Sequence, residues 1–216
     1  MEKLHFVFFT DQVDYVVLTT KVEIGIKWLE SVAKKKFNQN YDFLYKDPIT
    51  LTGTPDTWWG QVWDHINLNY PIGNYVCFVQ GAGGMAGGVG GKDGNYGVAV
   101  VGDWCIRSIV DGKTPLEFNG ETLPDWIIES GMNGQMGAWI HEMGHVVGAN
   151  HEDGGVMLEW WNWPKTSLPQ SYVNSQLFPY TSTASSSIVT IINGILNSYF
   201  NKIKKWRGGG SKWGKR

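Results

Sequence analysis

The sequence predicts an α+β fold, in which helices pack on a twisted mixed sheet and the N-terminal part is of the α/β type. Two patterns predict it. Short apolar runs alternate with helical patterns early in the chain, and helical patterns dominate its last third. The chain has 216 residues, of which 42% are hydrophobic and 18% are charged, so it is long enough for one folded domain and unlike a disordered protein.

The expected strands cover residues 4–9 (with 16–18 as a candidate continuation), 41–45, 75–80 and 96–102. Nine glycines lie between Gly81 and Gly97. So many glycines would cost a regular element backbone entropy, so we expect irregular backbone or an extended edge strand there. The segment lacks the Lys-Ser/Thr ending of a phosphate-binding loop, and we do not expect a nucleotide site.

The expected helices cover residues 19–37, 55–66, 133–147 and 188–203. The first should end in the lysines at 34–36, whose charge complements the negative end of a helix dipole. Residues 103–130 read as a long connection, with turn signals at Asp111-Gly112 and Asn119-Gly120.

The net charge of −2 is unevenly distributed. Residues 202–216 hold seven basic groups and no acid, which leaves 11 basic and 20 acidic groups, or −9, in the rest of the chain. The basic flexible tail at 207–216 either contacts an anionic surface or is simply solvated. We expect no nucleic-acid partner and no transmembrane segment, and the short apolar run at 6–9 does not predict a signal peptide.

The chain has two cysteines, Cys77 and Cys105, so it is not a disulfide-rich scaffold. The sequence is equally compatible with one disulfide and with two free thiols.

Residues 141–151 read His-Glu-Met-Gly-His-Val-Val-Gly-Ala-Asn-His. A helix places His141 and His145 on one face, one turn apart, which suits two ligands of a zinc ion. Gly148 can adopt a left-handed conformation that ends the helix, so that the chain turns back and His151 becomes the third ligand. Three histidines leave a fourth position for water, which is typical of a catalytic zinc site. The alternative, ordinary helix histidines, does not explain why all these residues lie in register.

This stretch resembles the long zinc signature of the metzincin metalloproteases, and combines features of adamalysins, matrixins and astacins. The resemblance implies a zinc helix, a methionine-containing turn at Met157 and a C-terminal helix. It implies one catalytic domain at 1–206, with an N-terminal subdomain at about 1–148 and a C-terminal one at about 149–206. It also implies a secreted or extracellular protein, whose glycine-rich edge strand receives the substrate.

The resulting hypothesis is a zinc endopeptidase that hydrolyses peptide bonds in peptides or proteins. One Zn²⁺ would polarise the carbonyl and the water, and Glu142 would act as general base without being a ligand. The alternative is a catalytically silent zinc-containing protein that recognises glycans or proteins through its aromatic surface. Its candidate residues are the tryptophans at 58–59 and 160–163, for which core and near-site packing is the favoured explanation.

Overall fold

The computed structural model describes residues 3–37, 41–90, 97–112, 117–118, 121–122, 125–175, 177–178 and 180–181. Its helices are α1 (Tyr15–Ala33), α2 (Pro55–Asn69), α3 (Asp103–Asp111), α4 (Asp125–Val146) and α5 (Gln170–Val173). Three 3-10 turns follow α4: η1 (His151–Asp153), η2 (Gly155–Met157) and η3 (Trp160–Asn162). The strands are β1 (Leu4–Phe9), β2 (Lys35–Lys36), β3 (Tyr41–Lys46), β4 (Asn74–Val79), β5 (Ala86–Val89), β6 (Gly97–Val101), β7 (Glu117–Phe118), β8 (Glu121–Thr122) and β9 (Tyr180–Thr181).

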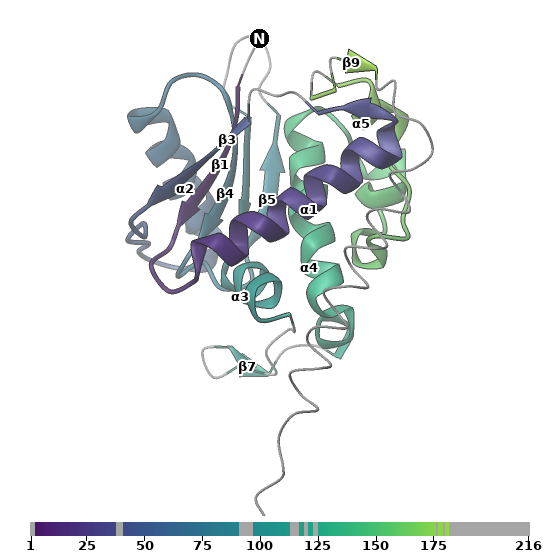
Figure 1. Ribbon diagram of the computed structural model, residues 1–216. Coiled ribbons are helices and arrows are strands. Elements are labelled where there is room, and N and C mark those ends of the chain that lie inside the picture. The colour runs from purple at the N-terminus through teal and green to yellow at the C-terminus, as the bar shows by residue number, and fades with distance from the viewer. Residues whose placement is uncertain are drawn as a thin grey trace, which may run out of the picture. The chain divides into compact units, whose positions relative to one another are not determined.

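A five-stranded sheet with the order β3-β1-β4-β6-β5 is the centre of the fold (Figure 1). Strands β3, β1, β4 and β6 are parallel, and β5 pairs antiparallel with β6 at the edge. The expected α+β class with a mixed sheet is therefore confirmed. The glycine-rich segment supplies the edge strand β5, which is one of the two outcomes expected for it.

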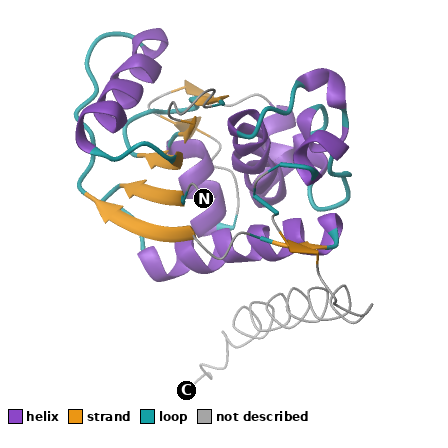
Figure 2. Ribbon diagram, turned by 90° about the horizontal axis from the view of Figure 1, so that it is seen from above, coloured by secondary structure: helices purple, strands orange, loops and turns teal. Residues whose placement is uncertain are grey.

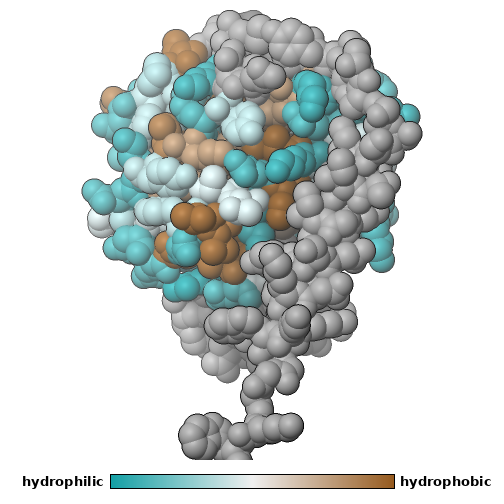
Figure 3. Space-filling model, in the orientation of Figure 1, coloured by the Kyte–Doolittle hydropathy of each residue, from teal (hydrophilic) through white to brown (hydrophobic). Residues whose placement is uncertain are grey.

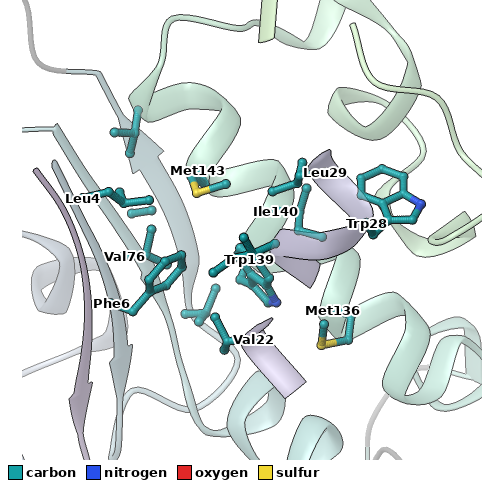
Figure 4. Close-up of a cluster of buried hydrophobic side chains, with 14 of the residues drawn as sticks. Leu4, Phe6, Val22, Trp28, Leu29, Val76, Met136, Trp139, Ile140 and Met143 are labelled. Atoms are coloured by element: carbon teal, nitrogen blue, oxygen red, sulfur yellow. The ribbon is translucent and has the colours of Figure 1, made fainter. Parts of the chain in front are cut away.

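Alternate residues of the strands face two separate hydrophobic cores. Helix α2 covers one face, against side chains such as Val7, Cys77 and Val100. Helices α1, α3 and α4 cover the other face, against side chains such as Phe6 and Val76 (Figures 1 and 2). Figure 4 shows Trp139, Ile140 and Met143 of α4 within this second core. Because α4 packs directly on the sheet, the helix that carries the histidine motif is a rigid element.

Helix α1 begins earlier and ends earlier than expected. The Asp14 carboxylate accepts hydrogen bonds from the backbone N–H groups of Val16 and Val17, so residues 16–18 start a helix and the expected strand continuation is wrong. Lys34 adopts a left-handed conformation with φ 51° and ends the helix. The following lysines pair with β9 as strand β2, so they do not lie in the last turn of the helix. Helix α1 crosses the face drawn in Figure 3, where hydrophilic and hydrophobic residues are interspersed.

The connection expected at 103–130 is also corrected. Helix α3 begins after Gly102 and ends at Gly112, whose φ is 73°, and helix α4 already begins at Asp125. The apolar spacing of Cys105, Ile106 and Ile109, which are buried against the second core, is the signal that predicts α3. The expected helix at 188–203 and the tail at 207–216 lie outside the described residues.

Cys77 and Cys105 are both free and buried. They belong to the cores on opposite faces of the sheet, so no disulfide can join them without rearranging the sheet. Of the helices that the structure describes, none combines the length and the apolar character that a membrane crossing needs.

Candidate metal centre

His141 and His145 lie one turn apart near the C-terminal end of α4. The helix is held in place by the side chains on its opposite face, so the two imidazoles have a fixed backbone beneath them (Figure 4). His141 is only 7% exposed, whereas His145 is partly exposed. One ligand position is thus deep in the protein and the other opens toward solvent.

The chain reverses direction immediately after α4. Gly148 has φ 88°, a conformation that favours glycine, and the Ala149 N–H donates to the Gly144 carbonyl at 2.9 Å. Turn η1 then begins at His151 and brings its ring back to the two histidines of the helix. All three sequence-predicted ligands are therefore brought together, in a group that could hold a metal ion.

The Nε2 atoms of the three histidines form a nearly equilateral triangle. Their separations are 3.1 Å between His141 and His145, 3.2 Å between His145 and His151, and 3.3 Å between His141 and His151. Nitrogen ligands about 2.05 Å from a tetrahedral zinc ion lie about 3.3 Å from one another. The triangle has the dimensions of three corners of a tetrahedral site.

Backbone carbonyls occupy the other ring nitrogen of the two helix histidines. Nδ1 of His141 lies 3.0 Å from the carbonyl oxygen of Val156, and Nδ1 of His145 lies 3.0 Å from that of Ala149. We assign the ring proton to Nδ1 in both, because a carbonyl only accepts hydrogen bonds. The lone pairs on the Nε2 atoms of the neutral rings then face one another and repel. A cation or a proton bound between them removes this repulsion. This donor set fits a metal ion bound through nitrogen.

Burial also keeps the helix histidines neutral. It lowers the pKa of His141 to about 4, and the neighbouring histidines add to this effect. Burial lowers the pKa of His145 as well. Metal ligands must be deprotonated, so both rings are in their ligating form at neutral pH.

Glu142 directly follows His141 in α4, and the group of three possible ligands does not include it. Its side chain is 9% exposed, and burial raises the pKa of its carboxyl to about 7. A carboxyl with a pKa near neutrality can both accept and release a proton at physiological pH. The role of Glu142 as general base stays a prediction.

Met157 ends turn η2 and is fully buried beneath α4. A Cβ atom at Gly144 would lie 2.2 Å from the Met157 sulfur, so the absence of a side chain at 144 lets the thioether reach the helix between the two histidines. The Tyr172 hydroxyl donates to the Ile140 carbonyl at 3.0 Å on the same side. Turn η2 and helix α5, which follow the third histidine in the chain, thus pack against the Gly144 side of α4.

An aspartate that sequence reasoning missed holds the loop of the third histidine. The Asp153 carboxylate accepts from the Asn150 N–H and from the Ser171 hydroxyl, both at 2.8 Å. These bonds join both ends of η1 to α5. The spacing Asn150-x-x-Asp153 is a capping-box pattern that could have indicated this role. The carbonyls that contact His141 and His145 have no comparable sequence signal, because they belong to the backbone.

The edge strand β5 lies directly on the helix that carries the histidines. A Cβ atom at Gly88 would lie 2.2 Å from the Glu142 carbonyl oxygen and 3.1 Å from Cβ of His145. The buried Asp103 carboxylate accepts from the N–H groups of Gly81 and Gly83, at 3.1 and 2.8 Å, and so fixes the turn that precedes β5. The glycines therefore permit a close approach between sheet edge and helix.

The remaining histidines lie outside the metal centre. Nδ1 of His5 is 2.6 Å from an Asp42 carboxylate oxygen, and His65 packs edge-on against Phe9. Both have structural surroundings.

The candidate tryptophans differ in their exposure to solvent. Trp163 is buried against Trp28, which agrees with core packing, whereas Trp161 is 43% exposed. Trp58 and Trp59 are half-buried on the α2 side of the sheet.

Comparisons with protein-family models, with curated proteins and with solved structures found no match to this chain.

Proposed function

We propose that this protein is a zinc-dependent endopeptidase of metzincin type. The observation that carries the proposal is the triangle of Nε2 atoms, together with the buried glutamate that directly follows His141 in α4 and is outside the ligand group. A closed structural zinc site has four protein ligands, whereas three histidines leave one position open. Zinc bound there would supply Lewis-acid polarisation of a carbonyl and would lower the pKa of water.

The residues of the site would then have separate roles. His141, His145 and His151 hold the ion, and the Val156 and Ala149 carbonyls orient two of the rings. Glu142 accepts a proton from the attacking water and gives it to the leaving amine. Burial raises the pKa of its carboxyl in the metal-free protein, and a bound cation would favour the carboxylate, the form that accepts the proton.

The edge strand β5 supports a peptide as the substrate. Among the described residues β5 pairs with β6 alone, so its other edge offers backbone N–H and C=O groups. An extended peptide can add to such an edge as a further strand. Gly88 brings this edge to the backbone of Glu142, and a peptide paired there would lie near the proposed general base.

The competing proposal is a silent zinc protein that recognises glycans or proteins through its tryptophans. The exposed Trp161 is the observation in its favour. An unfolded protein substrate separates the two proposals. We expect cleavage by the purified chain that a chelator stops and that stoichiometric zinc restores. Zinc binding without cleavage of any unfolded protein would contradict the endopeptidase and favour the silent protein.

A further inference from the structure

Neighbouring glycines of the edge strand β5 face opposite sides of the sheet. Gly87 pairs with Val100 and Gly88 pairs with Ala99 of β6. Residues directly opposite each other in an antiparallel pair lie on the same face. Val100 belongs to the core on the α2 face and Ala99 to the core on the α4 face. Gly87 therefore faces α2, and Gly88 faces the metal-centre helix.

The indole ring of Trp59 lies against Gly87. A Cβ atom at Gly87 would be 3.4 Å from two atoms of that ring, an ordinary contact distance. Trp59 is half-buried, and the ring of Trp63, one turn further along α2, lies 6.3 Å away. On the same face of β5, Val89 is 42% exposed. The edge strand is thus flanked on its α2 face by an apolar surface made by Trp59, Trp63 and Val89.

A peptide added to the outer edge of β5 would alternate its side chains between these two faces. A side chain on the face of Gly88 lies toward Glu142 and His145. The side chains immediately before and after it lie on the α2 face, beside Gly87 and Val89. Because residue 87 has no side chain, nothing from β5 covers the adjacent part of the Trp59 ring.

We propose that Trp59 is a specificity-determining residue, which favours substrates with an aromatic or large apolar side chain at the position that lies beside Gly87. This inference rests on the proposed peptidase function. The indole face offers stacking to an aromatic side chain and apolar contact to an aliphatic one. The neighbouring substrate positions point to the α4 face and do not contact Trp59.

The test is a cleavage profile of zinc-loaded protein on a random-sequence peptide library. The expected wild-type profile prefers Phe over Ala at one position, by about tenfold in kcat/KM. In Trp59→Ala this ratio falls to about one, while the preferences at the two adjacent positions stay unchanged. Leu68→Ala is the matched control, since Leu68 is an exposed apolar residue of the same helix, and it should retain the wild-type profile.

A second variant distinguishes a change in substrate specificity from a general defect in folding. Trp59→Arg should create a new preference for Asp or Glu at the same position, which a damaged protein cannot produce. If wild-type protein cleaves peptides and both Trp59 variants keep its profile, this inference is overturned and the proposed function stands. If zinc-loaded wild-type protein cleaves no peptide in the library, the proposed function fails and the inference fails with it.

Discussion

Nδ1 of His141 in α4 lies 3.0 Å from the carbonyl oxygen of Val156 in η2, 15 residues further along the chain. This bond joins the helix that carries His141 to the turn that contains Met157. Orientation of the His141 ring and folding of the segment after His151 are therefore coupled. Metal binding should consequently stabilise the whole fold and not the site alone.

Zinc should raise the free energy of unfolding of the chelator-treated protein. A ligand that binds only the folded state at 100 times its Kd stabilises it by about 2.7 kcal/mol. Denaturant titration with and without zinc measures this difference. His145→Ala should abolish it, whereas His65→Ala, a histidine outside the centre, should retain it. Equal zinc stabilisation in both variants would mean that the ion binds elsewhere.

Glu142→Gln should stabilise the metal-free protein, and the gain should depend on pH. Burial raises the pKa of Glu142 from 4.5 to about 7, so between these values the folded state binds a proton that the unfolded state lacks. Wild-type stability is then lost as the pH rises from 4.5 to 7, by about 3 kcal/mol. The amide has no such loss. Unfolding at pH 4 and pH 8 in chelator measures the gain, which should be present only at pH 8, and a gain that is equal at both values would contradict the burial effect.

Asp153→Ala should weaken zinc binding by about tenfold, because the carboxylate orients the loop that carries His151. Glu152→Ala is the matched control: it removes the same charge from the same loop, and no hydrogen bond of its carboxylate holds η1 in the structure. Competition with a chromophoric chelator measures both affinities. Equal losses in the two variants would assign the effect to charge and not to the hydrogen bonds of Asp153.

Replacement of two adjacent glycines of β5 by alanine should change the free energy of unfolding by different amounts. In Gly88→Ala the new Cβ atom would lie 2.2 Å from the Glu142 carbonyl oxygen, so strand and helix must separate, at a cost of about 1–3 kcal/mol. In Gly87→Ala it would lie 3.4 Å from Trp59, so the free energy of unfolding should change by less than about 0.5 kcal/mol. Thermal unfolding compares the two. Similar stabilities would show that β5 does not pack closely on α4.

The sequence predicts the elements whose signals are local. Neighbouring residues predict the buried strand β1, the half-buried strand β3, the spacing of the three histidines and the edge strand in the glycine-rich segment. The start of α1 was mispredicted because Val16 and Val17 have strand propensity, whereas the Asp14 cap decides the helix. Helix α1 ends earlier than expected because Lys34 adopts a left-handed backbone conformation. The residue preferences of lysine do not indicate this conformation.

The supports of the metal centre depend on contacts between distant segments. The carbonyls of Val156 and Ala149 reach the histidines only after the chain has turned at Gly148, and no side chain records this contact. The approach of Gly88 to Glu142 similarly joins residues from two elements. These relationships follow from the tertiary packing, and periodicity cannot predict them.

The proposed role of Glu142 as the general base of a zinc peptidase can be tested by one comparison. Cleavage of an unfolded protein is measured for zinc-loaded wild-type protein and for Glu142→Gln, with the zinc content of each determined. We expect the variant to retain one zinc ion per chain and to cleave at least about a hundredfold more slowly. A zinc-loaded Glu142→Gln protein that cleaves at the wild-type rate would contradict it.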